Sequence, residues 1–177
     1  MPFLIFRFPL LVSLSYFPLA QAASECNGLP GHYTVNPFQR QGGFVAKSAF
    51  VEVDSDGVNV PYVGRGVQVC ELASVSGNAR LTGFAVLYGS ARVYGKAQVH
   101  GDSQVYGNAK VSGNAQIFNS VHVFGNAKIY GDARICENAW VFENARVHGD
   151  ANVSGEAWVN GDLYLSTGQF QCSGLWH

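Results

Sequence analysis

Hydrophobic positions recur every six residues along most of this chain. The stretch Gly107–Val111 carries the pattern in its plainest form, as glycine, asparagine, alanine, lysine and valine. Closely similar phrases return at Gly113–Ile117, Gly125–Ile129 and Gly131–Ile135. From Arg65 to Ser166 the chain divides into six-residue units without insertion or deletion, and this predicts a repeat architecture.

Each unit has the alternation of a short strand followed by a turn. Counted from the glycine, the fifth position is always a branched aliphatic residue and the third is nearly always alanine. The exceptions at the third position are Val67, Ser103, Val121 and Leu163. The fourth and sixth positions are mixed, so the third and fifth are predicted to face inward and the fourth and sixth outward. Glycine followed by asparagine or aspartate tolerates positive φ and turns the chain.

A unit of this size cannot bury its apolar side alone, but a stack of units can, at about 1.5–3 kcal/mol for each buried Val or Ile. The units resemble those of the hexapeptide-repeat proteins, closely from Pro61 to Ser166 and loosely from Gln41. That family forms a left-handed parallel β-helix with three hexads in each triangular coil. The resemblance therefore implies an all-β fold, a single-stranded left-handed parallel β-helix (a β-solenoid) of about seven coils.

Four segments are predicted along the chain. Residues 1–22 are interpreted as a cleaved signal peptide, because an apolar run from Phe3 leads to an A-x-A cleavage pattern at 20–22. A membrane-spanning helix is the alternative, but Arg7, Pro9 and Pro18 interrupt a run that is short for a span. Residues 23–40 are predicted to form an irregular arm or cap, 41–166 the β-helix and 167–177 a C-terminal tail or cap. The mature chain is expected to be secreted, periplasmic or on the cell surface, without a membrane span.

Four cysteines in an exported chain predict two disulfides. With three hexads per coil, Cys70 and Cys136 lie too many coils apart for a disulfide. Cys26 in the arm can reach Cys70 near the first coils, and Cys172 can fold back to Cys136. The predicted pairs, Cys26–Cys70 and Cys136–Cys172, would staple the two ends of the solenoid.

Stacking every eighteenth residue sorts the outward positions into three faces. One face is polar and carries Arg80, Gln98, Gln116, Arg134 and Asn152. A second carries an aromatic column at the sixth position and three further large rings at the fourth. These residues are Tyr88, Tyr106, Phe124 and Phe142, and beside them His122, Trp140 and Trp158. The third has one cation per coil, at Arg92, Lys110, Lys128 and Arg146.

Two of these faces admit more than one interpretation. The aromatic face is either a ladder that stabilises its own sheet or a contact surface for self-association or a glycan. The basic stripe is either a solvated positive face, partly offset by Asp132 and Asp150, or a binding stripe for a polyanion such as an acidic surface glycan.

Familiar hexapeptide-repeat proteins are mostly acyltransferases, so the resemblance implies that activity as an alternative, with an exposed His122 as general base. Such enzymes often have a loop that leaves the helix beside the base, and no loop interrupts the hexads after Asn59. A γ-type carbonic anhydrase would bring three histidines to zinc, whereas His100, His122 and His148 are predicted on three different faces. No catalytic residue beyond the candidate His122, no metal and no cofactor are therefore predicted.

The resulting prediction is a secreted, non-catalytic β-solenoid with a structural, adhesive or ligand-binding role. Its aromatic face would mediate self-association, with a homotrimer as one form, or bind a cell-surface glycan. Nucleic acid is not a predicted partner, because the formal net charge is −1.

Overall fold

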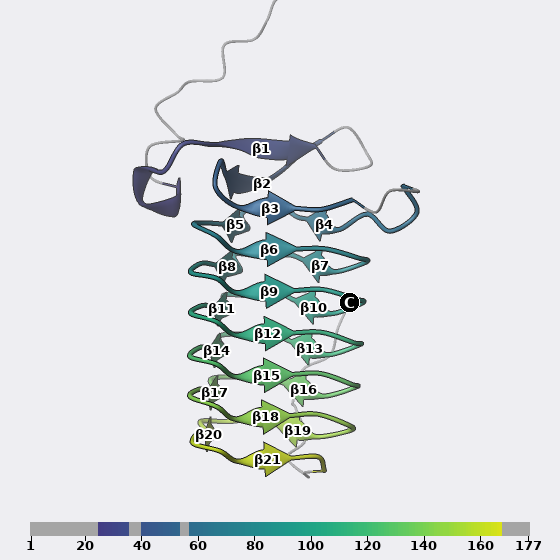
Figure 1. Ribbon diagram of the computed structural model, residues 1–177, viewed down its shortest axis with the longest axis vertical. Helices are drawn as coiled ribbons and strands as arrows, with labels where there is room; N and C mark the ends of the chain where they lie inside the picture. The colour runs from purple at the N-terminus through teal and green to yellow at the C-terminus, as the bar shows by residue number, and fades with distance from the viewer. Residues whose placement is uncertain (1–24, 36–39, 54–56, 168–177) are drawn as a thin grey trace, which may run out of the picture.

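The computed structural model describes residues 25–35, 40–53 and 57–167. These residues form a parallel β-solenoid, a triangular stack of short strands with almost no helix (Figure 1). The predicted signal segment 1–22 and the tail beyond residue 167 lie outside the described residues. Among those that are described, no helix is long and apolar enough to cross a membrane.

Three sheets form the sides of the solenoid, and each takes every third strand of the chain. The aromatic face is the outer side of β2 (Gln41–Ala46), β5 (Gln68–Val69), β8 (Val86–Leu87), β11 (Gln104–Val105), β14 (His122–Val123), β17 (Trp140–Val141) and β20 (Trp158–Val159). The basic face belongs to β3 (Phe50–Val51), β6 (Ser74–Val75), β9 (Arg92–Val93), β12 (Lys110–Val111), β15 (Lys128–Ile129), β18 (Arg146–Val147) and β21 (Tyr164–Leu165). The polar face belongs to β4 (Tyr62–Val63), β7 (Arg80–Leu81), β10 (Gln98–Val99), β13 (Gln116–Ile117), β16 (Arg134–Ile135) and β19 (Asn152–Val153).

Strands of neighbouring turns pair in parallel and in register, so that each outward position meets the same position one turn away. Gln104 pairs with His122, for example, and Lys110 pairs with Lys128. In Figure 1 the strands nearest the viewer run from left to right as the chain descends, which is a left-handed winding. Six complete turns, from β2 to β19, are followed by a partial turn of β20 and β21, so the predicted seven coils include one that is incomplete.

The core is the column of third and fifth positions, as the alternation predicts. Val105, Val111 and Ile117 from three successive strands are all fully buried and belong to one continuous cluster. Among the described residues, Ser103 is the buried polar exception. Its hydroxyl lies 2.9 Å from the carbonyl oxygen of His100 and 3.0 Å from that of Asn119, so the polar group is hydrogen-bonded within the core.

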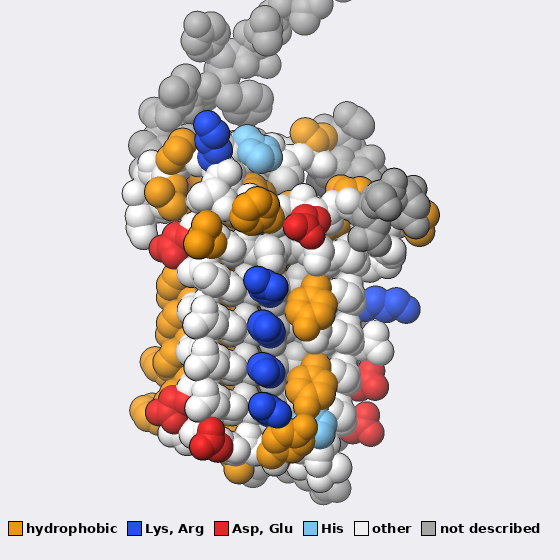
Figure 2. All heavy atoms as spheres, in the orientation of Figure 1, with side chains coloured by type: hydrophobic (Ala, Val, Ile, Leu, Met, Phe, Trp, Pro, Cys, Tyr) orange, Lys and Arg blue, Asp and Glu red, His pale blue; other side chains and the backbone are white. Residues whose placement is uncertain are grey.

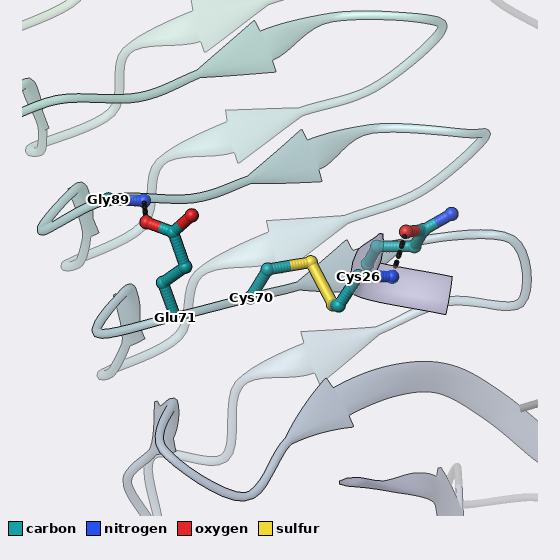
Figure 3. Close-up of a disulfide and its surroundings, with 5 residues drawn as sticks. Cys26, Cys70, Glu71 and Gly89 are labelled. Carbon is teal, nitrogen blue, oxygen red and sulfur yellow. Dashed lines mark hydrogen bonds between the residues drawn. A yellow bond between two sulfur atoms is a disulfide. The ribbon is translucent and has the colours of Figure 1, made fainter. Parts of the chain in front are cut away.

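The corners explain both the glycines and their replacements. At Gly107 φ is 68°, and a Cβ there would lie 3.1 Å from the backbone nitrogen of Gly125 in the next turn. Where glutamate occupies this corner position, its carboxylate accepts a hydrogen bond from the backbone N–H of the following turn. Oε2 of Glu143 lies 2.7 Å from the nitrogen of Gly161, and Glu71 binds Gly89 in the same way (Figure 3). At Glu143 this hydrogen bond accompanies a positive φ of 58°.

The N-terminal arm is more ordered than predicted. After the short 3₁₀ turn η1 (Glu25–Gly28), strand β1 (Gly31–Val35) pairs antiparallel with β2 and covers the first edge of the aromatic sheet. An uncovered sheet edge would leave backbone donors and acceptors free for other chains. The hexad pattern did not reveal β1, because this strand caps the stack and is not part of its repeat.

The predicted Cys26–Cys70 disulfide is confirmed, with the two Cα atoms 5.3 Å apart. The backbone nitrogen of Cys26 also donates to Oε1 of Gln68, at 2.9 Å (Figure 3). The bond ties the arm to the first turns. Cys136 is fully buried, and its predicted partner Cys172 lies outside the described residues. A disulfide of this kind is typical of an oxidising, extracellular environment.

Candidate functional site

The aromatic face carries a continuous stack of four rings. The ring centroids of Tyr88 and Tyr106 are 4.6 Å apart, those of Tyr106 and Phe124 4.8 Å, and those of Phe124 and Phe142 5.0 Å. Adjacent planes differ by no more than 4°. The parallel register produces this geometry, because it places the sixth position of each turn above the sixth position of the next.

A second column of rings lies beside the first. His122 packs against Trp140 with centroids 4.7 Å apart, and Trp140 stacks on Trp158 at 5.7 Å. The indoles also meet the first column edge-on, since Phe124 lies 5.9 Å from Trp140 and Phe142 lies 6.1 Å from Trp158. The structure therefore brings all seven predicted aromatic-face residues into one contiguous surface.

The outward positions of the aromatic face lack charge. From β5 to the residue after β20 they are Gln68, Cys70, Val86, Tyr88, Gln104, Tyr106, His122, Phe124, Trp140, Phe142, Trp158 and Asn160. The stacked rings are half-buried, whereas Trp158 at the end of the column is 67% exposed. An uncharged aromatic strip over several turns is unusual for a surface that only meets water.

Burial shapes the titration of this face. It lowers the pKa of His122, so the imidazole is neutral at neutral pH, and it raises the pKa of both Tyr88 and Tyr106. For Tyr88, the neighbouring Tyr106 and Glu71 raise the pKa further. The whole aromatic face thus stays uncharged around pH 7.

The four predicted cations form one straight column on the basic face, visible down the centre of Figure 2. Parallel pairing places Arg92 beside Lys110, Lys110 beside Lys128, and Lys128 beside Arg146. Within the part of the chain that the structure describes, none of the four is paired with a carboxylate. The same register that stacks rings on one face therefore stacks like charges on another.

A groove of about 570 Å³ opens at the N-terminal half of the basic face. Its lining comes from three chemical classes, namely large apolar, hydroxyl and charged side chains. The residues are Phe50, Leu72, Tyr94, Ser74, Ser76, Ser90, Glu52, Arg92 and Lys110. Sequence reasoning did not find the groove. The eighteen-residue period places Ser74 in the column of the cations, but Phe50 joins that column only because the first turn is longer than the others.

A second aromatic cluster lies at the C-terminal end of the basic face. His148 stacks on Tyr130 at 4.9 Å and meets Tyr164 edge-on at 4.6 Å, while the two tyrosine hydroxyls lie 3.0 Å apart. The guanidinium of Arg146 lies 5.6 Å from the ring centre of Tyr164. The bond to Tyr130 lowers the pKa of Tyr164 and Arg146 reinforces this, whereas the pKa of Tyr130 is raised. This cluster was also missed, although Tyr130 and His148 occupy sixth positions and Tyr164 a fourth position of the hexads.

The predicted catalytic alternative depends on His122. His122 lies on β14, and its in-register neighbours in the adjoining turns are Gln104 and Trp140. His100 follows β10 on the polar face and His148 follows β18 on the basic face, so the three histidines lie on three different sheets, as predicted. Among the residues that the structure describes, no group of three or more His, Cys, Asp or Glu side chains is placed to hold a metal ion.

Comparisons with known proteins add no family to this description. No protein-family model, no curated protein and no solved structure matches the chain.

Proposed function

We propose that this chain is an exported, non-catalytic β-solenoid of the hexapeptide-repeat type whose aromatic face docks onto a second copy of itself. The observation that carries the proposal is the aromatic face without a charged outward residue. Interface centres are enriched in Tyr, Trp and Phe and depleted in charged residues. A solvated ladder would not require the absence of charge over so many turns.

The stacking favours a protein partner over a sugar. Tyr106 has one ring face against Tyr88 and the other against Phe124, and Phe124 in turn is covered by Tyr106 and Phe142. Sugars stack on open ring faces, but these two rings present only their edges to the outside. Ring edges and the adjacent Trp158 suit packing against another apolar side chain.

Symmetry then limits the form of the assembly. Two aromatic faces that meet each other make a twofold, isologous contact and hence a dimer. In a trimer with threefold symmetry, the aromatic face would contact a different surface of its neighbour. The mass of the particle in solution distinguishes these arrangements.

The test measures that mass by size-exclusion chromatography with light scattering. The wild-type chain is expected to form an oligomer, and Tyr106→Ser/Phe124→Ser is expected to run as a monomer. Trp158→Ser serves as a second variant, because a side chain that is 67% exposed leaves the core intact when removed. The matched control is Tyr94→Ser, which removes an exposed ring from the basic face.

Tryptophan fluorescence gives an independent reading, since Trp140 and Trp158 both lie on the aromatic face. Dilution of the oligomer should shift the emission to longer wavelength as these indoles meet water. A wild-type monomer at every accessible concentration contradicts the proposal. Glycan binding by that monomer, lost in Tyr106→Ser/Phe124→Ser, would instead assign the face to a sugar.

A further inference from the structure

The groove on the basic face has the composition of a carbohydrate site. Phe50 and Leu72 are 54% and 59% exposed, and Tyr94 is 40% exposed and has no ring partner within the described residues. Unlike Tyr106 and Phe124, which have a ring against each face, Tyr94 therefore offers an open surface to the C–H face of a sugar. The hydroxyls of Ser74, Ser76 and Ser90, which also line the groove, can donate to and accept from sugar hydroxyls.

The groove continues into the column of cations. Arg92 and Lys110 belong to its lining, and Lys128 and Arg146 extend the column along the solenoid axis. Neighbouring turns are about 4.8 Å apart, as strands in a sheet are. An extended anionic chain that lies along the solenoid axis would therefore pass one cation at each turn of the column.

The charge at one corner beside the column changes sign along the solenoid axis. The corner next to the basic face carries Lys96 and Asn114 in the upper turns and Asp132 and Asp150 in the lower turns. Figure 2 shows this division at its right edge, with basic side chains above and acidic ones below. Glu52 lines the groove, but the corner beside the upper cations is basic and not acidic, and this favours the approach of an anionic ligand from that side.

Two features favour a sugar polymer over nucleic acid. Proteins that bind single-stranded nucleic acid stack successive bases on successive aromatic rings. Along the basic column, Tyr130 has one face against His148 and its hydroxyl bonded to Tyr164. The two open rings of the groove, Phe50 on β3 and Tyr94 after β9, do not lie on successive turns. The Cys26–Cys70 disulfide also indicates an extracellular setting, in which acidic polysaccharides are common partners.

We infer that the groove and the upper basic column bind an acidic polysaccharide, with Arg92 and Lys110 holding its carboxylates and Tyr94 packing against a sugar ring. Glu52 lies in the same lining and opposes an anion. The positive and negative side chains of the groove give opposite expectations for binding, because removal of a cation weakens the complex and removal of the Glu52 carboxylate strengthens it. The inference concerns a different face from the proposed self-association and can fail independently of it.

The experiment measures binding of the full, disulfide-bonded chain to polygalacturonate at low ionic strength by calorimetry. Fully methyl-esterified polygalacturonate is the matched ligand, since it keeps the sugar backbone and lacks the charge. Arg92→Gln/Lys110→Gln is expected to weaken binding about tenfold, and Glu52→Gln to strengthen it about twofold, from the usual size of exposed charge interactions. Arg134→Gln, an exposed cation on the polar face, should leave binding unchanged.

Melting of each variant by circular dichroism confirms that the solenoid is intact, because these side chains lie outside the core. The inference is overturned if polygalacturonate does not bind, if the esterified polymer binds as well, or if Arg92→Gln/Lys110→Gln and Arg134→Gln behave alike. Binding of poly(dT) and of vesicles containing phosphatidylglycerol is measured under the same conditions as binding of polygalacturonate. Tighter binding of either one would also overturn the assignment to a sugar.

Discussion

The aromatic face and the basic face have the same backbone, the same spacing between turns and the same core beneath them. Parallel register places each outward residue beside its equivalent in the next turn on both faces. On the aromatic face this repetition gives ring stacks with centroids 4.6–5.0 Å apart, which stabilise the fold. On the basic face it places like charges side by side, which costs about 1 kcal/mol per close pair in water before screening. One register thus stabilises one column and destabilises the other.

The comparison separates stability from ligand attraction. Rings in a filled stack contribute to folding, and they leave only edges for a partner. Cations in a column gain nothing from each other, so an anionic ligand relieves their repulsion. A surface that works against the fold is therefore the stronger candidate for binding a small or flexible ligand.

The largest expected effect tests whether the two faces share one core. Leu87→Ala removes a buried side chain beneath the aromatic face, and Ile129→Ala does the same beneath the basic face; both residues are fully buried. Each substitution is expected to lower the free energy of unfolding by about 2–5 kcal/mol. Urea denaturation measures both. If the two losses in the free energy of unfolding differed by more than about 2 kcal/mol, the two faces would be supported separately.

An intermediate effect should distinguish a stacked ring from a solitary one. Phe124→Ala removes a ring that stacks on two neighbours and meets Trp140 edge-on, and a loss of about 1–3 kcal/mol is expected. Tyr94→Ala is the matched control and should cost less than about 0.5 kcal/mol, as exposed surface positions usually do. Thermal denaturation of both variants, at a concentration where the chain is monomeric, gives the comparison. Equal losses would mean that the stack adds no stability.

The smallest effect has the opposite sign. Lys110→Gln/Lys128→Gln removes two adjacent like charges, so the free energy of unfolding should rise by up to about 0.5 kcal/mol. The gain should shrink as salt is added, because the Debye length falls from about 30 Å at 0.01 M to about 3 Å at 1 M. Urea denaturation at low and high salt checks both statements. A loss of stability at low salt would mean that the column is not repulsive.

Most of the fold could be predicted because the repeat leaves few alternatives. Alternation within the hexad determines which side chains are buried, and its unbroken period determines that the turns stack in register. Both the aromatic column and the cation column follow from that register. The Cys26–Cys70 pair was predictable for the same reason, since stacking excludes distant cysteines.

The features that escaped prediction depend on contacts that no period encodes. Strand β1 lies outside the repeat and is held by the exposed edge of β2. The groove exists because the irregular first turns bring Phe50 and Leu72 beside Arg92. The bond between the hydroxyls of Tyr130 and Tyr164 spans two turns and bypasses the intervening His148.

By itself, the sequence determined the solenoid, its buried columns and the identity of each face, because a side-chain period of two within a repeat of six allows one inward set. The tertiary structure decided which side chains remain open to a partner. Both ring faces of Tyr106 and of Phe124 are covered by their neighbours, whereas Tyr94 and the cations have no such cover. That distinction depends on distances across turns, and these exist only once the chain has stacked.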